Sequence, residues 1–150
     1  MGMVQNPPEG YQRIIPYLLY ADAPAACDFL CKAFGFTERF RIEMGEGALG
    51  HAELAMEESV VMLATAPPDS GFSSPRDLPG QSAFVTCYVD DVDAPIAAGA
   101  EVEEAEDKPY GDRSYRARDP EGHTWYFATH VRDVDPSEMV EAYPENGNCD

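Results

Sequence analysis

The apolar and polar residues of the first 66 positions predict a strand, a helix and three further strands. The segment Tyr11 to Tyr20 is rich in apolar and β-forming residues, and Asp22 follows it as a helix cap with Pro24 in the first turn. Gly35 then supplies a left-handed helix stop. Between these signals, apolar residues recur at helical spacing at Ala26, Phe29, Leu30 and Ala33. The three strand candidates that follow are Thr37 to Met44, Gly50 to Met56 and Ser59 to Thr65.

The same order of elements restarts after a loop rich in proline, serine and glycine, "APPDSGFSSPRDLPGQ". The pattern predicts a strand at Ser82 to Asp90, a short helix at Val92 to Ala98 closed by Gly99, a strand at Glu101 to Glu106, and a hairpin of Arg113 to Arg118 with His123 to His130. The second half of the chain therefore repeats the element order of the first.

Two aligned stretches make this repeat visible in the sequence itself. "YLLYADAPA" from Tyr17 aligns with "TCYVDDVDA" from Thr86, and "EESVVMLAT" aligns with "EGHTWYFAT". Four strands with one helix leave one face of their sheet uncovered, so two such units are expected to cooperate. We predict an α+β fold of two βαβββ modules whose sheets curve around a shared cavity. The expected boundaries are a single domain at 11–131 (modules 11–66 and 82–131, linker 67–81), an N-terminal extension at 1–10 and an acidic C-terminal tail at 132–150.

Composition and charge narrow the possible partners. The 150 residues carry a formal net charge of −18, which disfavours binding to phosphate backbones. The same charge attracts a cationic ligand, and it equally serves solubility or life in a salty cytoplasm. The apolar runs are shorter than the ~20 residues that span a bilayer, and the first ten residues show no secretory pattern. We therefore expect a cytoplasmic protein that binds neither membrane nor nucleic acid.

Two motifs invite a functional interpretation that their context does not favour. "GEGALG" matches a dinucleotide-binding pattern, but it leads into a strand rather than a helix, and Glu46 would oppose a pyrophosphate. We interpret it as a hairpin turn. The four cysteines, Cys27, Cys31, Cys87 and Cys149, form no C-x-x-C pair, which favours free thiols over a zinc site or a disulfide.

The chain combines the doubled βαβββ pattern with two informative stretches, "YLLYADAPAACDFLCKAFGF" and "VDDVDAPIAAGAEV…YGDRSYRARDPEGHTWYFATH". Because of these features, the chain resembles the glyoxalase / bleomycin-resistance / extradiol-dioxygenase superfamily over roughly residues 11 to 131. The "AFGF" helix end and the "DPEGH" hairpin are structural signatures of that family and do not specify a reaction. The resemblance implies a homodimer, because family members usually assemble their pockets in homodimers or in fused pairs of modules.

The resemblance also implies where a metal would be held, at equivalent points on the first and last strands of each half. Those positions are Ile15, Met62, Phe84 and Tyr126 here. A hard divalent cation prefers imidazole or carboxylate ligands, which none of the four supplies. We therefore expect no metal and no cofactor at the family site. His123 is expected to adjust the hairpin turn or to face solvent.

Strand alternation then selects the residues that face the predicted cavity. Two-residue turns at Glu57-Glu58 and Glu121-Gly122 set a trial register, which places Glu53 opposite Met62, His51 opposite Ala64, Tyr115 opposite Ala128 and Arg113 opposite His130. A one-residue slip would reverse these assignments. The predicted ligand-binding residues are Tyr17, His51, Glu53, Met62, Phe84, Tyr88, Arg113, Tyr115, Tyr126 and His130, whereas Val61, Leu63, Trp125 and Phe127 are predicted as core.

Three functions are compatible with these residues, and whether the chain is an enzyme stays open. The first is metal-free binding that sequesters an aromatic or cationic compound, as the antibiotic-resistance members of the family do. The second is a lyase, isomerase or dioxygenase that uses a relocated metal at His51, Glu53 and His130, or acid-base chemistry at His51 and Glu53. For His51 and Glu53, a salt-linked strand pair is the favoured interpretation over acid-base chemistry. The third is a regulatory module that acts through the acidic tail.

Overall fold

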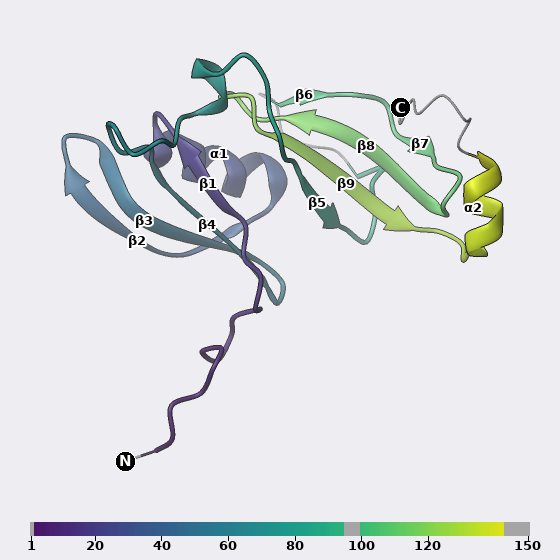
Figure 1. The fold of residues 1–150 in the computed structure, drawn as a ribbon, viewed down its shortest axis with the longest axis horizontal. Coiled ribbons are helices and arrows are strands. Elements are labelled where there is room, and N and C mark those ends of the chain that lie inside the picture. The colour runs from purple at the N-terminus through teal and green to yellow at the C-terminus, as the bar shows by residue number, and fades with distance from the viewer. Residues whose placement is uncertain (1, 95–99, 143–150) are drawn as a thin grey trace.

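A computed structural model describes residues 2–94 and 100–142 of the chain. It contains two mixed sheets and one long helix (Figure 1). The first sheet has the strand order β1-β4-β3-β2, with bounds Tyr17–Tyr20 for β1, Thr37–Gly45 for β2, Ala48–Met56 for β3 and Ser59–Thr65 for β4. Strand β1 runs parallel to β4, and the other neighbours are antiparallel. This is the βαβββ order that the sequence predicts for the first module.

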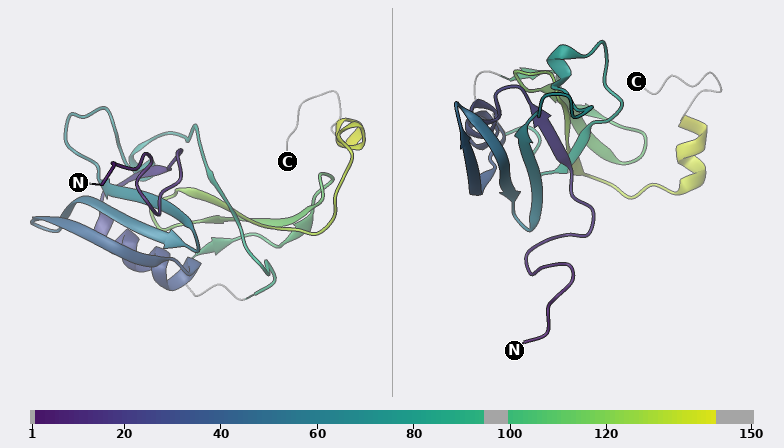
Figure 2. Two further views of the ribbon diagram at one scale, coloured as in Figure 1. Left: turned by 90° about the horizontal axis from the view of Figure 1, so that it is seen from below. Right: turned by 60° about the vertical axis from the view of Figure 1, so that its left-hand side comes forward.

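Helix α1 (Ala23–Phe34) forms where the sequence signals place it. The Asp22 carboxylate accepts a hydrogen bond from the backbone N–H of Ala25 at 3.1 Å, and Gly35 ends the helix with φ 78°. The helix contacts strands β1 to β4, so one face of the first sheet is covered (Figure 2, left). The opposite face, which we call the open face of the first sheet, carries Tyr17, Phe40, His51, Glu53 and Met62.

The second sheet follows the order β5-β9-β8-β6, with β7 also paired to β8. Its strands are β5 (Val85–Tyr88), β6 (Glu101–Val102), β7 (Glu106–Asp107), β8 (Asp112–Arg118) and β9 (Thr124–His130). The strand predicted at Glu101 to Glu106 is therefore two short strands. The helix predicted at 92–98 falls largely on residues 95–99, which lie outside the described residues. A 3-10 turn, η1 (Pro75–Asp77), lies in the connection between the sheets, and α2 (Pro136–Ala142) follows β9.

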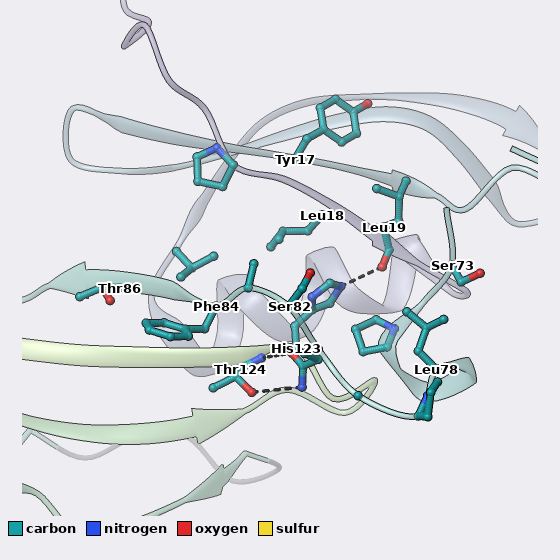
Figure 3. A pocket seen from close by; sticks show the side chains of 17 residues that line it. Tyr17, Leu18, Leu19, Ser73, Leu78, Ser82, Phe84, Thr86, His123 and Thr124 are labelled. Atoms are coloured by element: carbon teal, nitrogen blue, oxygen red, sulfur yellow. Dashed lines mark hydrogen bonds between the residues drawn. The ribbon is translucent and has the colours of Figure 1, made fainter. Parts of the chain in front are cut away.

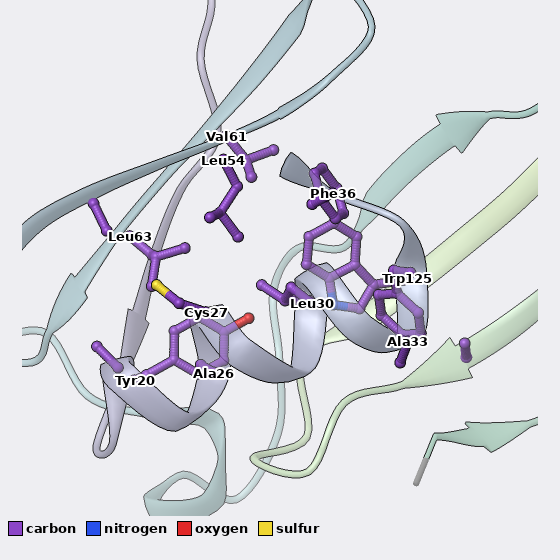
Figure 4. Packing of buried hydrophobic residues seen from close by; sticks show 14 of the residues in the cluster. Tyr20, Ala26, Cys27, Leu30, Ala33, Phe36, Leu54, Val61, Leu63 and Trp125 are labelled. Carbon is purple, nitrogen blue, oxygen red and sulfur yellow. The ribbon is translucent and has the colours of Figure 1, made fainter. Parts of the chain in front are cut away.

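The core joins the two modules around α1. The residues predicted as core, Val61, Leu63, Trp125 and Phe127, are all buried there. Figure 4 shows the first three of them around α1. Phe34 at the end of α1 contacts the rings of Trp125 and Phe127 at centroid distances of 5.6 and 4.8 Å, and Phe36 contacts Trp125 at 5.6 Å. Edge-on aromatic contacts of this kind add to the free energy of area burial. One module therefore packs its apolar face on the other.

Buried carboxylates of the "DPEGH" hairpin hold the same junction. Asp119 accepts hydrogen bonds from the Tyr20 hydroxyl and the Trp125 indole N–H. Glu121 accepts from the backbone N–H groups of residues 21 and 22 and from the Ser74 hydroxyl. His123, which was expected only to adjust the turn or to face solvent, contacts the carbonyl oxygen of residue 19 through Nε2 at 2.8 Å. The hairpin motif thus connects the second module to the first through hydrogen bonds.

The two hairpin registers differ in how well the sequence predicts them. In the first module the turn is Glu57-Glu58 and Glu53 lies opposite Met62, as predicted. "GEGALG" also forms the expected hairpin turn, because Gly45 pairs with Ala48 and both turn residues have positive φ. In the second module the predicted register is wrong by one residue, since Tyr115 lies opposite Phe127 rather than Ala128.

The slip follows from the turn between β8 and β9, which has three residues instead of two beyond the last pair, Asp119 with His123. Asp119 and His123 pair through the Asp119 N–H, and Pro120, Glu121 and Gly122 form the turn, with Gly122 at φ 96°. Proline fixes φ near the value that the first turn position needs, and glycine supplies the left-handed residue. A loop of odd length exchanges the faces of β8, so Asp112, Ser114 and Arg116 share the face of Tyr126, Ala128 and His130.

Candidate functional site

The open face of the first sheet holds a chain of polar side chains. Glu53 on β3 is only 3% exposed, and its Oε2 accepts a hydrogen bond from the Tyr11 hydroxyl at 2.7 Å. Its Oε1 lies 3.1 Å from Nε2 of His51, and Nδ1 of His51 lies 2.8 Å from the Tyr17 hydroxyl. Arg39 lies 3.7 Å from Glu53 and stacks over the Tyr11 ring. The structure thus brings together Tyr17, His51 and Glu53, three of the predicted site residues.

Two contributors to this cluster were not predicted. Tyr11 was assigned to the first strand, but β1 begins only at Tyr17, and the preceding segment instead lies against the sheet. Gln12 holds it there through two hydrogen bonds to the backbone of Val60. Arg39 lies at a register shift in β2, between Glu38 and Phe40. A β-bulge changes side-chain direction in a way that simple alternation does not anticipate.

The open face of the second sheet is aromatic at one end and acidic at the other. Phe84 and Tyr126 contact each other at a centroid distance of 4.8 Å. Tyr88 donates a hydrogen bond from its hydroxyl to the buried Asp112 carboxylate at 2.7 Å, and the other carboxylate oxygen lies 2.8 Å from Nδ1 of His130. Hydrogen bonds with Asp133 and Asp112 raise the pKa of His130 above its ordinary value of 6.5.

The register correction removes two predicted residues from this face. Tyr115 stacks on Phe127 in the core at a centroid distance of 5.5 Å, where burial raises its pKa to about 12. Arg113 lies opposite Thr129 and pairs with Asp93 and Asp107. Their places on the open face are taken by Asp112, Ser114 and Arg116, which the sequence analysis missed. A warning was present in "DPEGH", whose proline and glycine favour a three-residue loop.

A cleft of about 800 Å³ lies between the modules (Figure 3). Strand β1 contributes Tyr17, Leu18 and Leu19 to its wall, and the chain entering β5 contributes Phe84. The connection between the modules closes it with Pro75, Leu78, Pro79 and Gln81, none of which was predicted as a site residue. Gln81 is fixed there by hydrogen bonds to Gly122 and Thr124. The volume is that of a typical small-molecule site.

A second cleft of about 770 Å³ lies over the open face of the second sheet. Its polar lining includes Glu103, Glu104, Glu106, Asp112, Lys108 and Arg116, and its aromatic lining includes Phe84, Tyr88, Tyr110 and Tyr126. Arg116 pairs with Glu103, and Lys108 with Glu106. Beneath them, the Ser114 hydroxyl is buried and makes no hydrogen bond to the described part of the protein.

The residues at the family's metal positions do not fit a hard cation. Tyr17 on β1 lies opposite Met62, and the rings of Phe84 and Tyr126 contact each other in a tilted arrangement. Among the described residues there is no group of three or more His, Cys, Asp and Glu side chains placed to hold a metal ion. His130 belongs to the second sheet, whereas His51 and Glu53 lie on the first, so one chain does not gather the three residues of the relocated-metal hypothesis.

The described cysteines are free thiols, and burial keeps them protonated. Cys27 is fully buried in α1, and desolvation raises its pKa to about 12. Burial likewise raises the pKa of Cys87 to about 11. A thiol acts as metal ligand or nucleophile through its thiolate, so neither group is prepared for such chemistry at neutral pH. Cys149 lies outside the described residues.

Two mixed sheets that share a core around one long helix, with a cleft between them, define an α+β class of fold. Residues 13–127 match the family model of the glyoxalase/bleomycin resistance protein/dioxygenase superfamily, and the chain belongs to that superfamily. No helix in the described ranges, 2–94 and 100–142, has the length and apolarity needed to cross a bilayer.

Three relatives illustrate how far the similarity extends. An uncharacterised protein of Mycobacterium bovis is 37% identical over 141 residues, covering 89% of this chain and 93% of that protein. The crystal structure of TioX from Micromonospora sp. ML1 matches with a TM-score of 0.60 and 30% identity, covering 80% of this chain and 99% of that one. The fosfomycin resistance protein FosX of Listeria monocytogenes matches with a TM-score of 0.54 and 12% identity, covering 85% and 97%, and shows the fold alone.

Proposed function

We propose that this chain is a metal-free binding protein that sequesters a small aromatic or cationic compound. One observation carries the proposal: Phe84 and Tyr126, two of the four positions at which the resemblance implies a metal (with Ile15 and Met62), form an aromatic wall. Such a wall binds planar apolar groups, and it offers nothing that would polarise a substrate as a metal ion does. The neighbouring cleft has room for a drug-sized molecule.

The charge of the second cleft favours an aromatic ligand that carries a positive charge. Four carboxylates and two basic side chains line it, so its wall carries a formal charge of about −2. Tyrosine faces attract positive charge as well, through the quadrupole of the ring. A flat ligand that carries an ammonium or guanidinium group suits both features.

We further propose that the binding protein is a homodimer in which the open faces cover each other. Tyr17, Phe84 and Tyr88 are 44%, 62% and 63% exposed in the single chain, which is unusual for large aromatic residues on a sheet. A partner's second sheet placed over the first sheet would enclose these rings and complete the cavity. It would also bring the basic Arg116 of one copy toward Glu53 of the other. The free thiols suit a reducing cytoplasm, where we place the protein.

Thermal-shift measurements on metal-stripped, untagged protein test the proposal. The panel contains aromatic cations and aromatic neutral compounds in one arm and Mn²⁺, Fe²⁺, Ni²⁺ and Zn²⁺ in the other. A ligand that binds only the folded state raises the melting temperature. At a ligand concentration of a hundred times Kd, it adds about 2.7 kcal/mol to the free energy of unfolding. We expect a shift with an aromatic cation in the absence of metal.

Two variants decide whether the shift arises in this cavity. Tyr126→Ala removes half of the aromatic wall and should abolish the shift. Phe72→Ala truncates an exposed aromatic side chain outside both clefts and should preserve the shift. A shift with metal alone, or a ligand shift that survives Tyr126→Ala, would contradict the proposed function.

A further inference from the structure

The two sheets face each other at their edge strands, β1 and β5. Among the described strands, β1 pairs only with β4 and β5 only with β9, so each has one side of its backbone without a strand partner. The cleft between the modules is lined by residues 16–19 on one side and by residues 82–86 on the other (Figure 3). The two edges therefore border the same space.

The register of β1 determines which of its main-chain groups point into the cleft. The carbonyl oxygens of Pro16 and Tyr20 accept hydrogen bonds from N–H groups on the β4 side. Main-chain groups alternate in direction along a strand, so the N–H and C=O groups of Tyr17 and Leu19 point away from β4. His123 of the second module agrees with this direction, because its Nε2–H donates to the Leu19 carbonyl oxygen at 2.8 Å. The N–H and C=O of Tyr17 and the N–H of Leu19 then stay available to a ligand at this edge.

Strand β5 presents its own main-chain groups to the same space. The Val89 N–H donates to a carbonyl oxygen of β9. Alternation back along the strand turns Cys87 toward β9, and it turns Thr86 and Tyr88 away from β9. Thr86 lines the cleft from the side opposite to Tyr17. Both walls of the cleft thus carry main-chain donors and acceptors at the spacing of a strand.

A hollow of about 680 Å³ extends this space along β5 beyond the cleft. The cleft and the hollow share Pro16, Val85 and Thr86 in their walls, and the hollow continues to the end of β5. The hollow adds two carboxylates, those of Glu57 and Glu58 in the turn between β3 and β4. We call the cleft and the hollow together the edge slot. The edge slot is elongated along the strands and acidic where it meets this turn.

An extended chain is the ligand whose shape and hydrogen bonding fit the edge slot. A strand carries N–H and C=O groups on both of its sides, so it can pair with β1 and β5 at the same time. Its side chains alternate, and one set would meet Leu18 and Val85, which are partly buried and pack against the core. A basic side chain complements the charges of Glu57 and Glu58. A compact aromatic ring offers no such double row of main-chain groups.

We propose that the edge slot binds an extended peptide as an added strand between β1 and β5, with apolar residues at alternate positions and a basic residue beside Glu57 and Glu58. This site goes beyond the proposed function, whose ligand lies against the ring of Tyr126, a residue outside the edge slot. It is also compatible with the proposed homodimer. Main-chain groups at an edge point within the plane of a sheet, whereas the second copy covers the face of the sheet.

Fluorescence anisotropy with the peptide KVTVTVK, labelled with fluorescein at its N-terminus and amidated at its C-terminus, tests the proposal on the full-length protein. In an extended peptide the valine N–H groups point to one edge and the threonine N–H groups to the other. We expect saturable binding of this parent peptide. N-methylation of all valines, or of all threonines, should each lower the affinity about tenfold or more, because either change removes two or three main-chain donors.

Variants of the protein test each edge separately. Thr86→Pro removes an outward N–H of β5 and leaves the bonds to β9 in place, since proline is tolerated where the N–H of an edge strand faces outward. It should weaken binding of the parent peptide by about threefold to tenfold. The matched control Thr86→Val keeps the N–H and the branched shape and should leave the affinity unchanged. Leu19→Pro makes the corresponding change at the β1 edge, and melting temperatures check that each variant is folded.

Replacing Glu57 and Glu58 together by glutamine tests the charge of the edge slot. The double variant should bind the parent peptide more weakly, and its affinity should depend less on salt concentration than that of wild type, because two exposed charges no longer attract lysine. An unchanged affinity and salt dependence would overturn the placement of the basic residue.

The proposal fails if the parent peptide shows no saturable binding, or if N-methylation of either set leaves the affinity unchanged. It also fails if Thr86→Pro and Thr86→Val bind equally well with the fold intact. Sedimentation velocity on the same variants tests a competing occupant, a second copy of this chain. A dimer that dissociates in Thr86→Pro and Leu19→Pro, with no peptide binding to wild type, would assign the two edges to the second copy instead. None of these results decides the proposed function, which is tested by Tyr126→Ala.

Discussion

Replacing Asp119 by asparagine should destabilise the junction of the two modules far more than its small chemical change implies. Asp119 is 5% exposed and accepts four hydrogen bonds. Oδ2 accepts from the Tyr20 hydroxyl at 2.7 Å and the Trp125 indole at 3.2 Å, while Oδ1 accepts from two backbone N–H groups of its own hairpin. An asparagine keeps the two bonds from the backbone, but its NH₂ group then faces the Tyr20 O–H and the Trp125 N–H, which are both donors.

The magnitude follows from which donors find another partner. The Tyr20 hydroxyl can rotate and accept from the new amide, but the Trp125 N–H is a donor only and becomes unpaired in a fully buried position. An unsatisfied buried donor costs about 1–3 kcal/mol, and the remaining bonds lose their charge assistance. We expect a loss of about 2–4 kcal/mol in the free energy of unfolding, or roughly 2–4 °C in melting temperature per kcal/mol for a chain of this size.

Urea unfolding measures this loss, with fluorescence of the chain's single tryptophan and far-UV circular dichroism as independent signals. Asp77→Asn is the matched control, because Asp77 is mostly exposed and should change stability by no more than about 0.5 kcal/mol. The reasoning is wrong if Asp119→Asn costs less than about 1 kcal/mol while the control behaves as expected.

Two pH-dependent predictions follow from the carboxylates of the second module. Hydrogen bonds with Asp133 and Asp112 raise the pKa of His130, so the stabilisation is complete below about pH 6.5 and is lost as pH rises through the higher folded value. The stability difference between wild type and His130→Gln should therefore shrink from pH 5.5 to 8.5, and a constant difference would contradict this. Burial alone would raise the pKa of Glu121, but hydrogen bonds from Ser74 and two backbone amides hold it below 4.5. The stabilisation by Glu121 is present above about pH 4.5 and is lost as pH falls through the lower pKa of the folded state. Glu121→Gln should therefore make the free energy of unfolding depend less steeply on pH below about 4.5. An unchanged slope would contradict the lowered pKa of Glu121.

The sequence predicts the local elements well wherever one residue determines them. Asp22 and Gly35 mark the ends of α1, and the alternation from Ser59 to Thr65 gives β4 with its inward and outward faces. The internal repeat then predicts two modules, because each half repeats the same order of strands and helix. These features depend on neighbours in sequence, which is why they are visible without coordinates.

The site is less predictable, because it depends on loop length and on residues far apart in the chain. The extra loop residue in "DPEGH" exchanged Tyr115 and Arg113 for Asp112, Ser114 and Arg116 on the open face. The bond from Tyr11 to Glu53 joins residues 42 positions apart, through a segment that pattern alone assigned to a strand. The sequence predicts that His51 and Glu53 lie together. Their contact with Tyr17 was not predictable in the same way, because it depends on the parallel register of β1 with β4.

Isothermal titration calorimetry with an aromatic cation, before and after exhaustive treatment with EDTA, tests the central claim of metal-free binding most directly. Wild-type protein should bind with the same Kd and stoichiometry in both conditions, and Tyr126→Ala should lose most of the heat. Binding that disappears with EDTA and returns with one equivalent of a divalent metal would contradict the account.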